Sequence, residues 1–331
     1  MSRPTALVSA ARGIGDILRA TPLARVCLRL GYDVDLLLAP DYPGVAELLE
    51  RAEKIRRVYL LPGPWSGAGP RQTDGLDRES YDVAMFTTWS LPFRHLVHAR
   101  RTLAFEQSSW IREGDTASIR RIARALGWTE PLPPPFASPS SRRFALADGT
   151  VALHPGCKPD WPWKKWHGFE DLARRLPHVV VVGSPHDAEN ARTYFGRAFV
   201  WPAHVQDFAG ALSLPDTAAL LSQSAALVAN DSGLMHLGVA LGVPTFGIFG
   251  ITSPQRESIE ASNMFAITKQ LPCEPACRRG PWGRRDCEHH LQCLRTLSAD
   301  DVCDRIEALA PGVVRRVMAP PNIPGEPAWT N

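Results

Sequence analysis

The sequence predicts an α/β protein of two Rossmann-like domains whose parallel sheets face a central cleft. Along most of the 331 residues, short apolar runs alternate with segments of helical periodicity. This alternation is typical of mostly parallel sheets covered by helices on both faces. A proline-rich stretch at 131–135 interrupts the pattern, which begins again at Val151. A chain of this length also exceeds what one hydrophobic core usually supports.

The elements of the first half follow from the positions of apolar residues. The run at 6–10 leads into Gly13 and Gly15, and apolar residues then recur at helical spacing up to Leu30. This order predicts a strand, a glycine turn and a helix. Further strands are expected at 34–38, 58–60 and 81–86, with a helical stretch around 45–49.

The prolines after residue 130 remove backbone donors and stiffen the chain, so we expect a linker at about 129–149. It separates a predicted domain 1–145 from a predicted domain 146–318, and the proline-rich end, 319–331, is expected to be a loose tail. The second half predicts strands at 151–153, 179–182, 226–229 and 245–248, and helices near 169–176, 187–195, 214–222 and 234–241.

Composition limits the classes of function. Hydrophobic residues make up 44% and charged residues 21% of the chain, as in globular proteins. No run approaches the eighteen apolar residues of a membrane span, and the first residues do not resemble a signal peptide, so we expect a cytoplasmic protein. A net charge of +3 gives no reason to expect nucleic-acid binding.

The first turn after a strand, at 11–16, places two glycines and Asp16 at the head of a helix. Asp16 could simply cap that helix. A dinucleotide-binding turn is the other common meaning of such glycines, and Asp41 could then bind a ribose. That motif needs a third glycine where this chain has Leu18. Both interpretations stay open at this point.

The segment 228–236, Val-Ala-Asn-Asp-Ser-Gly-Leu-Met-His, joins a buried strand to a helix. The unpaired N–H groups at a helix start, with the Ser232 hydroxyl and the His236 imidazole nearby, favour a phosphate site. The alternative is an ordinary capped helix. A third segment, 154–166, carries Lys164 and Lys165 beside tryptophans after a strand. These lysines could hold an anion, because open α/β sheets bind ligands at the carboxyl ends of their strands.

Taken together, these segments resemble glycosyltransferase family 9, the bacterial heptosyltransferases. The residues that carry the resemblance occur in the family's order: Gly13-Ile14-Gly15-Asp16 with Thr21-Pro22-Leu23, Lys164-Lys165-Trp166 with Phe169, Val182-Gly183-Ser184-Pro185 with Asp187 and Glu189, the stretch 208–214, Asn230 to His236, Pro244, and Phe249-Gly250. They span most of the chain.

The resemblance implies a GT-B fold with the donor on the C-terminal domain and the acceptor on the N-terminal one. It implies inverting transfer of heptose from ADP-heptose, with no cofactor or metal required for catalysis and with Asp16 as general base. The residues expected to bind the donor and its diphosphate are Gly13, Gly15, Lys164, Lys165, Asp187, Glu189, Asp231, Ser232, Gly233, Leu234 and His236.

The acceptor is left open, because little of the family pattern is found between Trp65 and Gln107. A glycan or lipid-linked acceptor of lipopolysaccharide core assembly, a protein acceptor of autotransporter type, and a small metabolite are all compatible. A non-catalytic nucleotide-sugar binder is a further alternative. Arginines at 278, 279, 284 and 285 could contact the inner membrane peripherally, or form a solvated loop.

Four of the seven cysteines cluster in the loop 273–293, as Cys273, Cys277, Cys287 and Cys293. They could bind a structural zinc or iron ion through four thiolates, although none of the intervals is the CxxC spacing of a zinc ribbon. In a reducing compartment, free thiols are the alternative. A family branch that glycosylates autotransporter adhesins is similar in carrying a cysteine-rich iron site.

Overall fold

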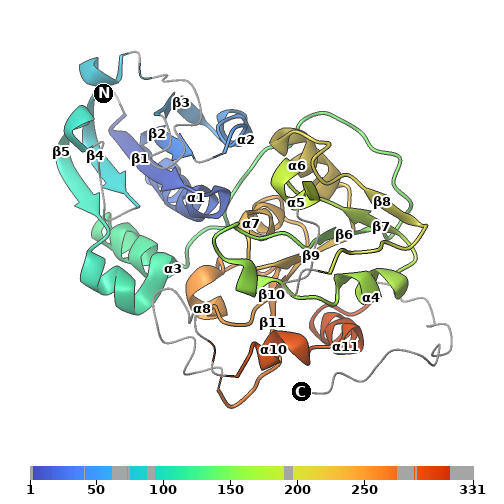
Figure 1. Ribbon diagram of the computed structural model, residues 1–331. Helices are drawn as coiled ribbons and strands as arrows, with labels where there is room; N and C mark the ends of the chain where they lie inside the picture. Colours follow the sequence, from blue (N-terminus) through green and yellow to red (C-terminus); the bar gives the residue numbers. More distant parts are fainter. Residues whose placement is uncertain are drawn as a thin grey trace, which may run out of the picture.

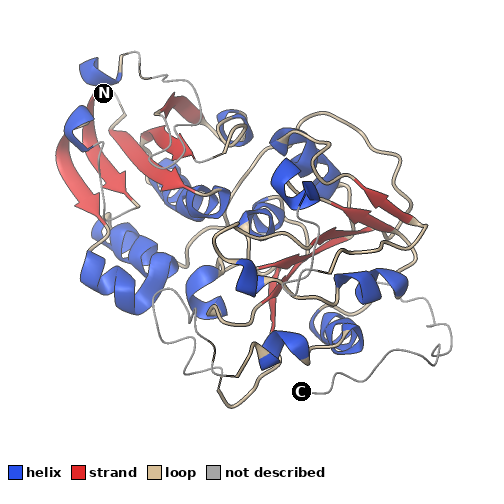
Figure 2. Ribbon diagram, in the orientation of Figure 1, coloured by secondary structure: helices blue, strands red, loops and turns tan. Residues whose placement is uncertain are grey.

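The computed structural model describes residues 3–40, 42–61, 73, 75–87, 94–189, 197–273, 287 and 289–313. These residues form two lobes, each built on one parallel sheet (Figure 1). Helices and loops surround both sheets (Figure 2). Within these ranges, no helix is both long and apolar enough to cross a membrane.

The first sheet has the strand order β3-β2-β1-β4-β5, and all neighbouring strands are parallel. Its strands are β1 (Thr5–Arg12), β2 (Asp33–Pro40), β3 (Ile55–Leu60), β4 (Ser80–Phe86) and β5 (His98–Ala104). The helices of this lobe are α1 (Ile14–Arg29), α2 (Glu47–Glu50) and α3 (Gln107–Ala125), with short 3-10 turns η1 (Leu76–Arg78) and η2 (Arg94–Leu96). The strands predicted in this half are present, whereas β5 and α3 were not anticipated.

The second sheet has the order β11-β10-β9-β6-β7-β8, again entirely parallel. Its strands are β6 (Val151–His154), β7 (Val179–Val181), β8 (Val205–Asp207), β9 (Ala226–Asn230), β10 (Thr245–Ile248) and β11 (Met264–Ile267). The helices are η3 (Pro162–Lys164), α4 (Phe169–Arg174), α5 (Pro185–Glu189), α6 (Leu214–Ser222), α7 (Gly233–Ala240), α8 (Pro254–Glu257), α10 (Gln292–Arg295) and α11 (Ala299–Leu309).

Both sheets reverse their strand order next to their first strand. The chain moves outward from β1 to β3 on one side and returns to β4 on the other, and β6 to β9 repeat this arrangement. At such a switch point the loops after the two central strands diverge, and open α/β sheets bind ligands there. The two turns singled out from the sequence follow β1 and β9, so each lies at the switch point of its own sheet.

A threonine-proline pair inside α1 connects this helix to the linker. Pro22 lacks the N–H group that would donate to the Leu18 carbonyl. The Thr21 hydroxyl donates to that carbonyl instead, at 2.8 Å. The same hydroxyl accepts the N–H of Phe136 at 3.0 Å. The pair therefore keeps the helix regular and attaches the linker to it.

Residues 129–149 contain no helix or strand and run between the lobes. The Ser138 N–H donates to the Leu48 carbonyl of the first lobe at 2.7 Å. Two residues later, the Ser140 hydroxyl donates to Asp216 of the second lobe at 2.7 Å. The backbone thus changes lobe inside the predicted linker, and the exact domain limits stay a prediction.

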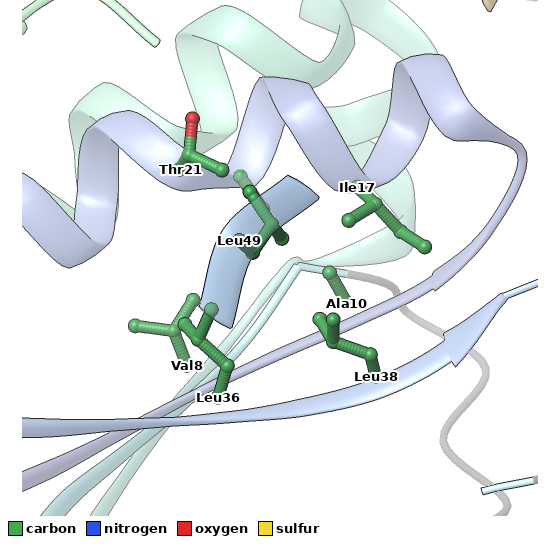
Figure 3. A pocket seen from close by; sticks show the side chains of 8 residues that line it. Val8, Ala10, Ile17, Thr21, Leu36, Leu38 and Leu49 are labelled. Atoms are coloured by element: carbon green, nitrogen blue, oxygen red, sulfur yellow. The ribbon is translucent and has the colours of Figure 1, made fainter. Parts of the chain in front are cut away.

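The core of the first lobe packs α1 and α2 on β1 and β2, leaving one small cavity there (Figure 3). Apart from Thr21 its lining is apolar: Val8, Ala10, Ile17, Ala20, Leu36, Leu38 and Leu49. Its volume of about 10 Å³ leaves room for no more than a water molecule. We regard this cavity as a packing gap and not as a ligand site.

Candidate active site

The turn between β1 and α1 has an uncommon backbone conformation. Arg12 has a φ angle of 84°, in the left-handed region that non-glycine residues rarely adopt. Gly13 follows as the cap of α1, and its N–H donates to Asp16 Oδ2 at 3.2 Å. The Asp16 side chain remains 36% exposed. Asp16 therefore caps the helix and still presents a carboxylate at the carboxyl end of β1.

Arg19, one helical turn after Asp16, lies under that carboxylate. Its guanidinium donates to Asp16 Oδ1 at 2.5 Å. It also pairs with Asp115 at 2.8 Å and with Glu257 at 3.2 Å. Burial opposes the charge of Arg19, but the carboxylates of Asp115 and Asp16 outweigh burial and raise its pKa. Arg19 is therefore a permanent cation beneath Asp16.

The turn between β9 and α7 is fixed by an asparagine. The Asn230 amide is buried, donates to the Pro155 carbonyl at 2.8 Å and accepts the Trp166 N–H at 3.0 Å. It thereby fastens the loop after β6 to the end of β9. Ser232 is the cap of α7, and its hydroxyl accepts the Met235 N–H at 3.4 Å. The capping interpretation of Ser232 is thus correct, and it is compatible with a phosphate site, because the other N–H groups of the first turn have no partner inside the helix.

Lys164 and Asp231 form an ion pair beside this turn. Lys164 Nζ lies 2.8 Å from Asp231 Oδ2, and the two side chains are 16% and 5% exposed. Burial disfavours both charges, yet each charge stabilises the charged form of the other side chain. The pKa of Lys164 is therefore raised and that of Asp231 is lowered. The Trp161 ring centroid lies 5.3 Å from Lys164 Nζ, a cation–π distance. Both groups are therefore charged at neutral pH.

The two turns meet where α1 contacts α7. A Cβ atom at Gly15 would lie only 2.4 Å from Cδ2 of His236, and one at Gly233 would lie 3.1 Å from Cβ of Ile14. Glycine at both positions is what allows the helix starts to approach so closely. Burial, with Arg19 nearby, lowers the pKa of His236 to about 3, so its ring is neutral. Its Nδ1 atom is buried and has no hydrogen-bond partner among the described residues.

Two of the predicted donor residues, Asp187 and Glu189, lie on α5 of the C-terminal lobe. The Asp187 carboxylate accepts the N–H and hydroxyl of Ser184 at 2.8 and 2.7 Å, which caps α5. It also lies against Gly156, where a Cβ atom would come within 2.1 Å of Asp187 Oδ1. Glu189 is exposed at the end of α5. Local capping accounts for Asp187, and the donor role of these two residues stays a prediction.

Comparison with known proteins identifies the family. A model of glycosyltransferase family 9 (heptosyltransferase) matches residues 129–281. Lipopolysaccharide heptosyltransferase 2 of Escherichia coli K12 is 32% identical over 225 residues, which are 62% of this chain and 62% of the relative. Residues 129–281 belong to glycosyltransferase family 9. The chain spans less than two thirds of the length of each curated relative that it matches.

Solved structures show the fold of this chain. The structure of E. coli ADP-heptose lps heptosyltransferase II has a TM-score of 0.65 and 19% identity, and the match covers 92% of this chain and 98% of that one. The iron-containing dodecameric glycosyltransferase TibC from enterotoxigenic E. coli H10407 has a TM-score of 0.59 and 16% identity, covering 93% and 76%. These matches confirm the predicted GT-B fold. The match to a glycosyltransferase family also removes the interpretation of residues 11–16 as a dinucleotide-binding turn, for which Asp41, outside the described residues, was the ribose candidate.

The cysteine loop of the chain is described only in part. Cys277, the arginines at 278, 279, 284 and 285, and the tail 319–331 lie outside the described residues. Cys287 packs beside Trp161, whereas Cys293 belongs to the core around α11. Among the described residues, no three histidine, cysteine or acidic side chains are close enough to hold a metal ion. The described thiols alone do not make up a ligand set, and the metal site stays a prediction.

Several charged residues of this site were missed from the sequence. Arg19 could have been found, because it lies three residues after Asp16 on the same helix face. Asp115 and Glu257 carry no comparable signal. They come from α3 and α8, far from Asp16 in sequence, and only the packing of these helices brings them to Arg19.

Proposed function

We propose that this chain is an inverting glycosyltransferase that transfers heptose from ADP-heptose to an acceptor hydroxyl. The observation that carries the proposal is the contact between the starts of α1 and α7, which brings a carboxylate and an anion-binding helix end together. Sugar transfer needs both a proton acceptor and a site for the leaving diphosphate. The names of the relatives support heptose and ADP as the transferred sugar and the nucleotide.

In the proposed reaction, the acceptor oxygen attacks the anomeric carbon from the face opposite the diphosphate. The new carbon–oxygen bond forms as the bond to the diphosphate breaks, and that electron pair leaves with ADP. Asp16 takes the proton of the acceptor hydroxyl. Its partial exposure allows contact with a substrate, and Arg19 keeps the carboxylate in one orientation.

The leaving diphosphate would lie at the N-terminus of α7. The first N–H groups of that helix, its dipole and the Ser232 hydroxyl favour a negative charge there. Lys164 has three N–H donors, so it can keep Asp231 as a partner and still donate to a phosphate oxygen. Neutral His236 is available as a hydrogen-bonding group and adds no charge. In the proposed reaction, these groups neutralise the charge of the leaving diphosphate, and no divalent metal ion is required.

For the acceptor, we propose a sugar hydroxyl of the lipopolysaccharide core, reached from the cytoplasmic side of the inner membrane. The proposal is supported by the curated relatives, which are named lipopolysaccharide heptosyltransferases. A protein acceptor is the second candidate, favoured by the cysteine-rich loop and by the fold shared with TibC, an iron-containing glycosyltransferase. The two candidates require different acceptors but the same donor.

The test is acceptor-dependent release of ADP from ADP-heptose by the full chain. Core oligosaccharide, an adhesin-derived peptide and free monosaccharides are compared, with UDP-glucose as the control donor. We expect ADP release from ADP-heptose with one acceptor class, and no UDP release from UDP-glucose with any acceptor. Tight ADP binding without acceptor-dependent release would instead favour a nucleotide-sugar binder.

A further inference from the structure

The contacts of Arg19 link the proposed base to the opposite lobe. The Arg19 side chain is 8% exposed and is shared by carboxylates from three helices: Asp16 of α1, Asp115 of α3 and Glu257 of α8. The first two belong to the N-terminal lobe, whereas α8 belongs to the C-terminal lobe. One buried cation thus joins the two halves directly under Asp16.

The contact with Glu257 is double. Nη1 of Arg19 donates to the side-chain Oε2 and to the backbone carbonyl of Glu257, both at 3.2 Å. Arginine suits this role, because its planar guanidinium presents several fixed donors to different acceptors at once. If the lobes separated, Arg19 would lose both bonds to Glu257 and keep only the carboxylates of its own lobe. The hydrogen-bonding environment of Asp16 therefore depends on how the lobes are docked.

Glu257 also lies on the segment that borders the donor side. Thr252, five residues earlier, lies near Asp231, the partner of Lys164, and its side chain contributes to lowering the pKa of that carboxylate. The short stretch 252–257 thus contacts the Lys164–Asp231 pair near its start and Arg19 at its end. Its docking is reinforced by close packing, because a Cβ atom at Gly114 of α3 would lie 3.3 Å from the backbone of Arg256.

We propose that Arg19 is a positioning residue for Asp16, and that Glu257 makes this positioning depend on the donor-side lobe. The inference rests on the proposed function, since it assigns a role to neighbours of the proposed base. Arg19 orients the Asp16 carboxylate through Oδ1, while Oδ2 is held by the Gly13 N–H. Correct orientation of the base follows from docking of the 252–257 segment, so proton abstraction is favoured only when the lobes are together.

The test separates turnover from donor binding. In Arg19→Met, we expect kcat to fall on the order of 100-fold, because a base displaced by about 1 Å loses that much. The Kd of ADP, measured by calorimetry, and the KM of ADP-heptose should change by less than about threefold, within the factor of 2–3 by which context moves such contributions. Arg19→Lys keeps the positive charge but not the planar donors, so its kcat should be about tenfold higher than that of Arg19→Met.

Glu257→Gln is the second variant, because it leaves Arg19 paired with two carboxylates and does not threaten folding. We expect a kcat loss of about tenfold, and a combined loss in Arg19→Met/Glu257→Gln that is smaller than the product of the single losses. The matched control is Arg120→Met with Glu260→Gln. Arg120 and Glu260 also pair α3 with the C-terminal lobe, but their side chains are 36% and 64% exposed and neither contacts Asp16. These control variants should keep wild-type kcat.

The outcomes distinguish this inference from the proposed function. If the wild type shows no acceptor-dependent ADP release, the proposed function is wrong. If the wild type is active and Arg19→Met and Glu257→Gln keep its kcat, only the role of Arg19 is wrong. A parallel loss of ADP affinity and kcat would also overturn the inference, because Arg19 would then support the general docking of the lobes and not the orientation of Asp16.

Discussion

The starts of α1 and α7 are the same structural unit with opposite electrostatics. Each follows a central parallel strand, each has a glycine at its first turn, and the two are in contact. In α1 the N-terminal N–H groups face a carboxylate, because Asp16 accepts the Gly13 N–H. In α7 the cap is the uncharged Ser232 hydroxyl. An anion already occupies the first helix end, whereas the second is free to attract one.

The surrounding charges reinforce this difference. Beneath Asp16 lies a guanidinium that holds the carboxylate, and beside Ser232 lies Lys164, whose charge is stabilised by Asp231. Neutral His236 lies between the two helix ends and adds no charge to either. The strand–turn–helix unit therefore supplies position only. The side chain at the cap decides whether that position takes a proton or binds a phosphate.

The largest effect should come from making the first helix start like the second. Asp16→Ser keeps a hydroxyl able to accept a helix N–H but removes the proton acceptor. We expect kcat to fall on the order of 100- to 10,000-fold, while ADP binding is retained. Steady-state ADP release and calorimetry measure the two quantities. Asp16→Asn is the control of equal size, and it should be as inactive as Asp16→Ser. Near-normal turnover in either variant would mean that another carboxylate is the general base. Asp115→Asn would then be the first variant to test.

The reverse change should have a smaller effect. Ser232→Asp leaves a good cap on α7, so the helix should remain folded, but it places a negative charge where the diphosphate is expected. We expect the Kd of ADP to rise about 10- to 100-fold, because the carboxylate repels the diphosphate and cannot donate the hydrogen bond of the serine hydroxyl. Asparagine is similar in size to aspartate but carries no charge. The Kd of ADP for Ser232→Asn should therefore lie within about threefold of that for Ser232→Ala. Equal affinity in Ser232→Asp and wild type would place the diphosphate elsewhere.

Apart from the edge strand β3, the strands that could be predicted from the sequence are those with two buried faces. Central strands such as β1 and β9 are continuous apolar runs and were predicted within a few residues. The strands that were missed, β5, β8 and β11, all lie at sheet edges. Each buries only part of its side chains, so its hydrophobic pattern is weak. The order of the strands within each sheet could not be predicted in this way, because it depends on the packing of the whole lobe.

The site divides in the same way. Asp16 and Ser232 lie within four residues of the strands before them, and Lys164 lies on the loop after β6, so local sequence and family resemblance indicated them. Arg19 has four partner atoms supplied by Asp16, Asp115 and Glu257, and no local pattern specifies such a set. The contact of His236 with Gly15 likewise joins residues of two lobes. Such contacts are set by how the lobes dock, which a one-dimensional pattern does not record.

The last effect concerns stability and leaves activity aside, and it tests whether the residue between the two helix ends is neutral. The pKa of His236 is about 3 in the folded chain, against an ordinary value of 6.5, because burial and Arg19 oppose protonation. Between these values the unfolded chain binds the proton and the folded chain does not. The free energy of unfolding should therefore fall as pH drops below about 6.5, with a contribution of about 1.4 kcal/mol per pH unit from this residue.

Urea unfolding of wild type and His236→Leu at several pH values between 7 and 4 measures that contribution. His236→Leu should show a shallower loss of stability on acidification, whereas replacement of the exposed His98 by Gln should leave the slope of the wild type unchanged. If wild type and His236→Leu lose stability in parallel, the ring is protonated in the folded state. The starts of α1 and α7 would then share a cation, and their opposite electrostatics could not be ascribed to the caps alone.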